Sequence, residues 1–261
     1  MAKNTYGYVN SDYLKAAAEL FAPIKCRSFE LLDNIVGRTV LDLGCGPGLD
    51  TLALAARVGE QGRVTGVDCD AEMIALARCR AQRSDVAAQV LHLRADACEL
   101  PFTDKAFDAL RSERLFMHLT HPEAALAEAV RVTRPGGKVV IVDSDWGSLS
   151  TATELTEIER NLARFRAESF LPNGYSGRRL FGLMRECGLE QIGLETFALH
   201  LTDLPLWRYL TQAEAVEAAA LNHGFSQVEM HQWHSALQDS YQKGNFFSSI
   251  SVVIAAATKP Y

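Results

Sequence analysis

Between residues 37 and 145, short runs of apolar and β-branched residues alternate with longer stretches in which apolar positions recur every three or four residues. The short runs predict strands and the longer stretches predict helices, because side chains alternate along a strand and repeat about every 3.6 residues on a helix. The predicted strands are 39–43, 63–68, 89–94, 107–112 and 138–143, and the predicted helices are 49–58, 70–83 and 122–133. This alternation predicts an α/β fold with an open, doubly wound, mostly parallel sheet.

The segments on either side of this alternation carry mainly helical patterns. Residues 11–35 show one apolar face and contain Pro23, which we expect to break the helix. Amphipathic helices are also predicted at 153–169 and 176–187, before a strand-like stretch at 190–200. The sheet core is therefore expected to carry a helical cap made from separated segments.

The predicted organisation follows from these patterns. Its parts are an N-terminal helical cap or lid (1–36), an α/β core (37–200, with the helical segment 150–172 joining the cap), a helical cap insertion (201–245) and a final core strand (246–261).

Composition and charge narrow the class of protein. The formal net charge is −6, and nucleic-acid-binding proteins usually show a net basic surface, so nucleic acid is not the expected partner. The six cysteines form no C-x-x-C pair and are expected to be reduced. MAKNTYGYVN lacks the apolar stretch of a secretory signal, and the longest purely apolar run, 252–257, is far shorter than the roughly 20 residues of a membrane span. We expect a soluble, cytoplasmic protein; a homodimer or larger homo-oligomer stays open.

A glycine-rich corner follows the first predicted strand, where Asp42 precedes Gly44, Gly46 and Gly48. Glycine lets the backbone approach a ligand and adopt positive φ, and ligands bind at the carboxyl ends of strands in doubly wound sheets. A G-x-G-x-x-G/A dinucleotide motif aligned at Gly44 would end at Leu49, and no G-K-[ST] follows the glycines. Both phosphate-binding motifs therefore fail.

The corner resembles motif I, D-x-G-x-G-x-G, of the class I S-adenosylmethionine-dependent methyltransferases. GVDCDAEMIALAR, LRADACELPF, FDALRSERLFMHL and EAVRVTRPGGKVVIVD follow in the order typical of the ubiquinone/menaquinone-biosynthesis-type branch, the methyltransferase-11 group. The resemblance covers about residues 37–145. It implies a Rossmann-like fold, S-adenosylmethionine as cofactor and S-adenosylhomocysteine as product.

The resemblance also implies which residues bind the cofactor. Asp68 would hold the ribose hydroxyls, which suits a charge-assisted bidentate contact, and Met73 would pack on the adenine. In the alternative interpretation Asp68 is only a helix N-cap, a role for which Asp70 is better placed. The full predicted cofactor-binding set is Asp42, Gly44, Gly46, Gly48, Asp68, Cys69, Met73, Asp96, Ala97 and Ser112.

Methyl transfer by in-line displacement needs orientation, desolvation and, for a hydroxyl or carbon acceptor, a base. His118, after the fourth predicted strand, is the first candidate for the base; a packing role or a cofactor contact are its alternatives. Asp143 or Asp145, at the end of the fifth strand, is expected to hydrogen-bond the acceptor, and Asp145 is the second predicted catalytic residue. Glu113 and Arg114 are predicted to form a local ion pair.

No metal site is expected. His231 and His234 are three residues apart, but no carboxylate or cysteine is spaced to complete a site with them. The fifth strand ends in Asp143-Ser144-Asp145-Trp146 instead of the Asp-Asn pair of catechol-type methyltransferases, which argues against Mg²⁺. The [DNS]-P-P-[FY] and Pro-Cys motifs of base-directed methyltransferases are absent from the expected places.

Aromatic residues gather in the predicted cap segments and favour an apolar pocket. They predict a small or medium hydrophobic acceptor, such as a polyketide, terpenoid, indole or quinone scaffold. The stretch from Tyr6 to Tyr13 is expected to close over the cofactor as a lid, or to be disordered without ligand. Two other functions stay open: an NAD(P)-dependent oxidoreductase, disfavoured by Leu49, and a non-catalytic S-adenosylmethionine-binding protein.

Overall fold

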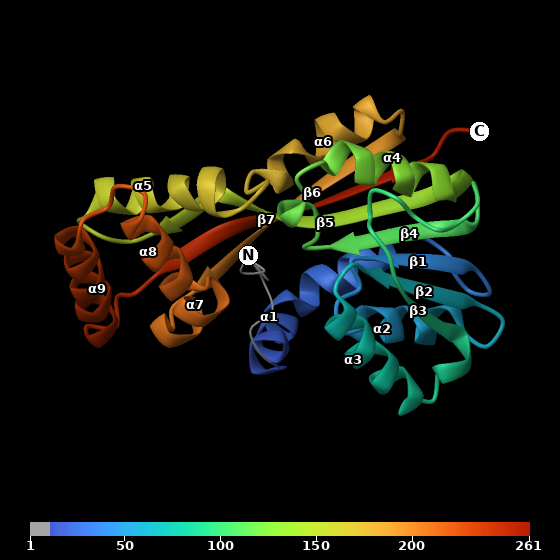
Figure 1. Cartoon of the computed structure of the whole chain (residues 1–261), viewed down its shortest axis with the longest axis horizontal. Coiled ribbons are helices and arrows are strands. Elements are labelled where there is room, and N and C mark those ends of the chain that lie inside the picture. The colour runs from blue at the N-terminus through green and yellow to red at the C-terminus, as the bar shows by residue number, and fades with distance from the viewer. Residues whose placement is uncertain (1–10) are drawn as a thin grey trace.

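A seven-stranded sheet forms the centre of the computed structural model, which describes residues 11–261, with side chains from Glu19 onward (Figure 1). The strand order is β3-β2-β1-β4-β5-β7-β6. The strands are β1 (Thr39–Leu43), β2 (Arg63–Asp68), β3 (Val90–Arg94), β4 (Phe107–Glu113), β5 (Thr133–Thr151), β6 (Glu190–Leu201) and β7 (Ser248–Thr258). Strands β1 to β5 pair in parallel, and β7 runs antiparallel to both β5 and β6. The predicted open, mostly parallel α/β sheet is confirmed.

Helices cover both faces of this sheet. They are α1 (Ser11–Glu30), α2 (Leu49–Val58), α3 (Ala71–Gln82), α4 (Pro122–Val132), α5 (Thr156–Phe165), α6 (Ser176–Glu186), α7 (Leu204–Leu210), α8 (Ala213–Leu221) and α9 (Gln227–Gln242). Shorter turns are η1 (Ala87–Gln89), η2 (Phe116–His118) and the π-helical η3 (Arg166–Phe170). Within the described chain, no helix combines the length and the apolar character that crossing a bilayer requires.

The central strands are apolar on both faces because both faces are covered. In β5, Val139 and Ile141 belong to a buried cluster shared with α4 and α6. Val140 and Val142 belong to the cluster on the opposite face, which is shared with α1 and α2. Successive side chains of a strand point to opposite faces, and here both faces are buried, so the apolar residues of β5 form a continuous run.

Helix α1 continues through Pro23, so the predicted break in this helix is wrong. A proline in a helix interior costs about 3 kcal/mol, because it removes a hydrogen bond and crowds the preceding turn. The residues around it offset this cost: Phe21 and Ile24 are buried in the cluster under α1. Tertiary packing, which local sequence does not reveal, keeps the helix continuous.

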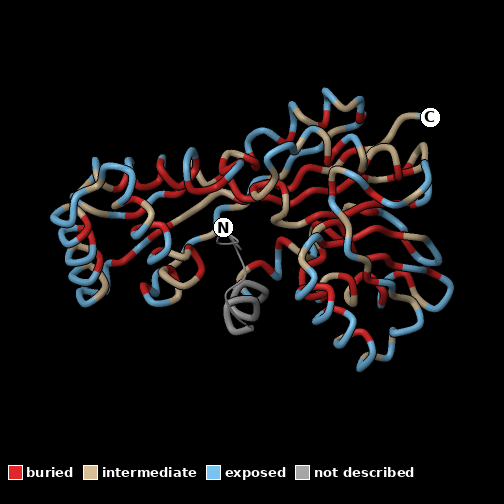
Figure 2. Tube along the Cα trace, viewed as in Figure 1, coloured by how far each residue is buried: buried red, intermediate tan, exposed pale blue. Residues whose placement is uncertain are grey.

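The long strand β5 carries the fold beyond the core, since it extends well past the predicted strand at 138–143. Its far end, with the ends of β6 and β7, supports α5, η3, α7, α8 and α9, which form a cap at the left of Figure 1. These helices bury their own apolar cluster, in which the rings of Trp207 and Trp233 lie 6.4 Å apart. Figure 2 shows buried residues along the strands and on the inner sides of the cap helices. Both predicted segments, 150–172 and 201–245, contribute to this cluster.

Candidate active site

The site lies where the strand order reverses. The carboxyl ends of β1, β2 and β4 are in register, since Leu43 pairs with Val67 on one side and with Ser112 on the other. After β1 the chain continues to β2 on one side of β1, and after β3 it crosses back to β4 on the other side. The connections on the two sides of β1 therefore run in opposite directions along the sheet. Such a switch point opens a crevice at the carboxyl edge of a doubly wound sheet, where ligands bind.

The glycine-rich loop after β1 borders this crevice. Gly44, Gly46 and Gly48 have φ values of 75°, 51° and 81°, a conformation that favours glycine. A Cβ on Gly44 would lie 2.9 Å from the Leu115 Cβ, and one on Gly48 would lie 2.9 Å from the Ala77 Cβ. Gly44 and Gly46 line the cavity described next, whereas Gly48 packs inside the fold. The three glycines are therefore needed for the tight turn and its packing, and two of them also border the cavity.

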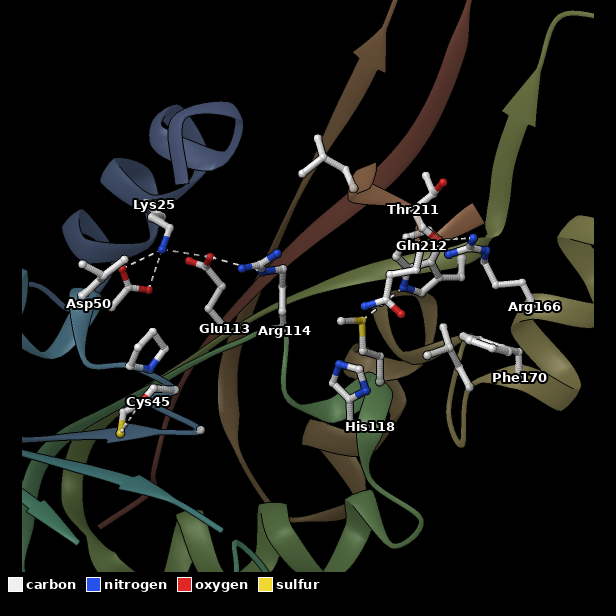
Figure 3. A pocket seen from close by; sticks show the side chains of 18 residues that line it. Lys25, Cys45, Asp50, Glu113, Arg114, His118, Arg166, Phe170, Thr211 and Gln212 are labelled. Atoms are coloured by element: carbon white, nitrogen blue, oxygen red, sulfur yellow. Dashed lines mark hydrogen bonds and ion pairs between the residues drawn. The ribbon is translucent and has the colours of Figure 1, made fainter. Parts of the chain in front are cut away.

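A cavity of about 880 Å³, which counts the space at its open mouth, extends from this loop to the cap (Figure 3). We call it the first chamber. Its core wall consists of Lys25, Gly44, Cys45, Gly46, Pro47, Leu49, Asp50, Glu113, Arg114, Met117 and His118. Its cap wall consists of Trp146, Arg166, Phe170, Leu171, Leu210, Thr211 and Gln212.

Arg111 holds the charges of the core wall in place. Its side chain has no solvent exposure, and its Nη1 lies 3.0 Å from Asp50 Oδ2. Its Nη2 donates to Glu113, and its Nε donates to Ser28 Oγ at 2.8 Å. The guanidinium thus joins helices α1 and α2 to strand β4 beneath the chamber.

Lys25 adds a second cation to this network and joins α1 to α2 and β4. Its Nζ lies 2.6 Å from Asp50 Oδ1 and 3.2 Å from Glu113 Oε1 (Figure 3). Burial raises the pKa of Asp50, but Arg111 and Lys25 outweigh it and lower that pKa to about 2. Asp50 therefore stays ionised. The predicted pair of Glu113 and Arg114 is confirmed, with 3.7 Å between Oε1 and Nε.

Asp42 lies behind the glycine loop and does not line the chamber. Its Oδ2 accepts a hydrogen bond from Thr51 Oγ1 at 2.7 Å. Burial, together with the nearby charge of Asp50, raises the pKa of Asp42 to about 7. The acids that reach the cavity are Asp50 and Glu113, so the cofactor contact expected of Asp42 stays a prediction.

Asp68, at the end of β2, joins that strand to the glycine loop. The residue is 7% exposed; its Oδ2 accepts from Gly46 N and its Oδ1 from Asp70 N, both at 2.9 Å. Burial raises the pKa of this carboxyl. Asp70, as anticipated, is the N-cap of α3: its Oδ1 accepts from Glu72 N at 2.7 Å and from Met73 N at 3.4 Å.

The other predicted cofactor residues lie on the β2–β3 side of the loop, opposite the chamber. Asp68 is in register with Arg94 on β3, so Cys69, Asp96 and Ala97 follow two neighbouring strand ends. Cys69 and Asp96 are exposed, while Ala97 and Met73 are buried. None of these residues lines the first chamber. They form a second stretch of edge that an elongated ligand could reach by crossing the glycine loop.

Ser112 lies at the carboxyl end of β4, beside Leu43 of β1. It is fully buried, and its Oγ has no hydrogen-bond partner among the described residues. It does not line the chamber, so its predicted cofactor contact stays a prediction.

His118 closes η2 and lines the core wall. Its Nδ1 is buried and has no hydrogen-bond partner within the described part of the chain. Burial and the neighbouring charge of Arg114 lower the pKa of His118 to about 4. The imidazole is therefore neutral near pH 7 and can accept a proton.

The two aspartates of β5 do not line the chamber. Asp143 is fully buried and accepts from Met117 N at 2.8 Å and from Ser176 Oγ at 3.0 Å, which fixes the turn that carries His118. Burial raises the pKa of Asp143 to about 7. Asp145 Oδ2 accepts from Arg178 Nε at 2.7 Å, and the residue lines neither chamber. Its catalytic role stays a prediction that this placement does not favour.

A second chamber of about 550 Å³, also counting its open space, continues from the first. The two share Arg114, Met117, Trp146, Leu210 and Thr211. The rest of the second chamber is formed by Leu20, Phe21, Ser144, Leu149, Leu199, Leu201, Trp207, Ser248, Ser249 and Ile250. Apart from Arg114, the lining residues that the structure describes carry no charge, so this chamber suits an apolar group.

Two expectations from the sequence concern other places. The Tyr6–Tyr13 lid lies outside the residues whose side chains the structure describes. In the described chain, no group of three or more His, Cys, Asp or Glu side chains could hold a metal ion. His234, one of the spaced histidines, instead contacts Glu217, with 2.6 Å between Nε2 and Oε2.

Sequence reasoning missed Lys25, Asp50 and Arg111. Asp50 stands two residues after the last motif glycine, in the first turn of α2, which is the one local signal. Lys25 and Arg111 come from segments distant along the chain, and no spacing relates them to the loop.

Comparison with known proteins identifies the family to which the chain belongs. A family model described as a methyltransferase domain matches residues 41–141. An uncharacterized 37.1 kDa protein of a Streptomyces fradiae transposon is 33% identical over 88% of this chain and 65% of its own. The O-methyltransferase rstn1 of Aspergillus nomiae is 31% identical over 62% of this chain and 69% of its own. A 2-phytyl-1,4-naphtoquinone methyltransferase of Thermosynechococcus vestitus is 41% identical over 41% of this chain and 46% of its own.

The chain thus spans about half to two thirds of the length of these relatives. Among solved structures, the YcgJ protein from Bacillus subtilis superposes with a TM-score of 0.68 at 20% identity, covering 92% of this chain and 99% of that one. At this identity the likeness concerns the fold.

Proposed function

The chain belongs to the class I S-adenosylmethionine-dependent methyltransferases, and we propose that it transfers a methyl group from S-adenosylmethionine to a small or medium-sized hydrophobic metabolite, without a metal ion. The observation that carries this proposal is the difference between the residues on the two sides of the glycine loop. The buried carboxylate of Asp68 lies on one side, and a cavity walled by paired charges and apolar cap residues lies on the other.

The residues present fit the methyl donor. The carboxylate of Asp68 would hold the ribose hydroxyls, with Met73 and Asp96 toward the adenine. The amino-acid tail of the donor carries both an ammonium and a carboxylate, and the core wall offers Lys25 together with the carboxylates of Asp50 and Glu113. When bound, S-adenosylmethionine supplies an electrophilic methyl group on a positively charged sulfur that is also the leaving group.

The side chains of this protein would then orient the acceptor, exclude water and remove a proton. His118 is our candidate for that last task, because its neutral imidazole lines the chamber. A pKa of about 4 makes this histidine a weak base, which suits acceptors with an acidic proton, such as phenols and enols.

The second chamber supports a hydrophobic acceptor. It continues from the wall that holds His118 through Met117 and Trp146, so an apolar body could occupy it while the reacting atom stays in the first chamber. The names of an O-methyltransferase and a naphthoquinone methyltransferase among the relatives agree with an oxygenated ring as acceptor.

Asp68 provides the test of the donor site. We expect Asp68→Ala to weaken binding of S-adenosylhomocysteine by about 2 kcal/mol, or about 30-fold, from loss of a charge-assisted contact. Isothermal titration calorimetry measures this, with NADH as a second titrant that should not bind. Asp70→Ala is the matched control: it removes the neighbouring cap, costs about 1 kcal/mol of folding free energy and leaves the affinity unchanged. Unchanged affinity in Asp68→Ala would remove the ribose assignment.

His118 provides the test of the chemistry. We expect His118→Ala to lower kcat by roughly 10²–10⁴-fold with unchanged S-adenosylhomocysteine affinity, because the base is lost and the donor site is intact. Release of S-adenosylhomocysteine from a panel of phenolic and quinol acceptors gives kcat. His121→Ala, an exposed histidine three residues further on, is the control.

The pH profile sharpens this test. Because the pKa of His118 lies near 4, wild-type kcat should stay level from about pH 8 down to pH 5 and fall only as the imidazole becomes protonated near pH 4. A fall centred near 6.5, the ordinary value for histidine, would contradict the assignment. If turnover and donor affinity decline together in His118→Ala, the residue is a cofactor ligand.

A further inference from the structure

Five residues other than glycine adopt a left-handed backbone in the described chain: Asp33, Lys105, Arg114, Gln191 and Gln212. Residues that carry a side chain rarely adopt this backbone conformation, and those that do cluster at functional sites. Arg114 and Gln212 are the two of this set that line the first chamber, one on each wall. Gln212, with φ 50°, stands in the two-residue junction between α7 and α8.

The surroundings impose this conformation on the junction. Arg166 Nη2 donates a hydrogen bond to the Thr211 carbonyl oxygen, and Thr211 Oγ1 donates to the Trp207 carbonyl oxygen at 2.7 Å. Gln212 N in turn donates to the Tyr209 carbonyl oxygen at 3.2 Å. On the other side, Val216 N donates to the Gln212 carbonyl oxygen at 3.1 Å. The backbone is therefore held on both sides of Gln212, and the side chain leaves it in one direction.

That direction is into the first chamber. Figure 3 shows Gln212 extending from the cap toward His118 on the opposite wall. The side chain is half-buried, and its carboxamide makes no hydrogen bond to a described residue. The cap wall that carries it is largely apolar, with Phe170, Leu171 and Leu210, and also includes the guanidinium of Arg166. An unpaired donor and acceptor thus face the histidine across the cavity.

We propose that Gln212 positions the acceptor by hydrogen bonding to a neutral oxygen substituent, a hydroxyl or carbonyl, on an apolar ring. This inference rests on the proposed function and specifies its substrate class. With the ring reaching the second chamber and its oxygen on Gln212, the methyl-accepting atom is directed toward His118. A carboxamide can donate to a carbonyl and accept from a hydroxyl, whereas a hydrocarbon would leave it buried and unpaired.

The test compares two probes of equal size, 1-naphthol and 1-methylnaphthalene, bound to the protein saturated with S-adenosylhomocysteine and titrated by NMR. Wild type should bind 1-naphthol about tenfold more tightly, since one hydrogen bond distinguishes the probes. Gln212→Gly should abolish this preference while its affinity for 1-methylnaphthalene stays unchanged. Glycine adopts the left-handed backbone readily, so the variant should fold at least as stably as wild type.

Gln191→Gly is the matched control. Gln191 has φ 51°, lies on β6 outside both chambers and accepts a hydrogen bond from Thr258 Oγ1 at 3.2 Å. This variant should keep the tenfold preference. Equal affinity of wild type for both probes, including no measurable binding of either, overturns the proposal, as does a preference that survives in Gln212→Gly. The readout needs no turnover, so failure of donor binding or of methyl transfer, which would sink the proposed function, is recorded separately.

Discussion

The two walls of the first chamber differ in how they are built. On the core wall the buried or half-buried charges compensate one another: Lys25 and Arg111 both contact Asp50 and Glu113. Among the described residues of the cap wall, Arg166 is the one ionised side chain, beside apolar residues and a carboxamide. Paired charges around a backbone loop suit a polar ligand of fixed shape, whereas an apolar wall with few hydrogen-bonding groups selects by shape and by single polar contacts.

The walls also differ in where they come from along the chain. The family match spans 41–141 and so contains most of the core wall, but it ends before Trp146, the first residue of the cap wall. The wall that we propose for the donor is therefore largely the part that this chain shares with the family model. The cap wall, assembled from β5, η3, α7 and the junction after it, is where we expect acceptor specificity to reside.

The largest expected effect comes from breaking the core wall. Arg111→Ala should lower the free energy of unfolding by about 3–5 kcal/mol, because Asp50 and Glu113 lose their fully buried cationic partner. Lys25 and, at 3.7 Å from Glu113, Arg114 are the cations that remain beside them. It should also weaken S-adenosylhomocysteine binding, since Asp50 borders the glycine loop. Urea denaturation and calorimetry measure the two effects.

Arg57→Ala is the control for this prediction. The guanidinium of Arg57 lies over the Phe29 ring at 4.2 Å, as that of Arg111 does at 4.5 Å, but Arg57 is exposed. Its removal should cost less than about 1 kcal/mol. If the two variants lose similar stability, the buried charge network is not what holds the core wall together.

The sequence predicts those parts of the fold that depend on neighbours along the chain. Alternating apolar runs predict the five parallel strands, β1 to β5, and Asp70 is recognisable as an N-cap because capping is local. Continuity of α1 through Pro23 and the length of β5 depend on tertiary contacts, so local patterns misjudge both.

The candidate site divides in the same way. The glycines stand in one motif and are visible in the sequence. Lys25 and Arg111 meet Asp50 from 25 and 61 residues away, and no motif announces such contacts. The role we propose for Gln212 depends on its left-handed backbone, beside which Arg166 donates a hydrogen bond to the Thr211 carbonyl oxygen and Gln212 N donates to the Tyr209 carbonyl oxygen. A glutamine in a sequence gives no sign of φ.

The smallest expected effect tests the cap wall. Leu210 lines both chambers, and although it is only 9% exposed, its side chain borders empty space on two sides. Leu210→Ala should therefore cost about 1–2 kcal/mol of folding free energy, below the roughly 2–5 kcal/mol usual for a buried leucine. Leu204→Ala, in the same helix but packed in the cap cluster and outside both chambers, should reach that usual range. Urea denaturation compares the two.

Calorimetry on these two variants decides whether the core wall and the cap wall bind different ligands. Leu210→Ala should change the affinity for 1-methylnaphthalene, because the two chambers merge where this side chain stood, and should leave the affinity for S-adenosylhomocysteine unchanged. Leu204→Ala should change neither affinity at temperatures where it is folded. A loss of S-adenosylhomocysteine binding in Leu210→Ala would mean that the cap wall also holds the donor, and the division of roles between the walls would fail.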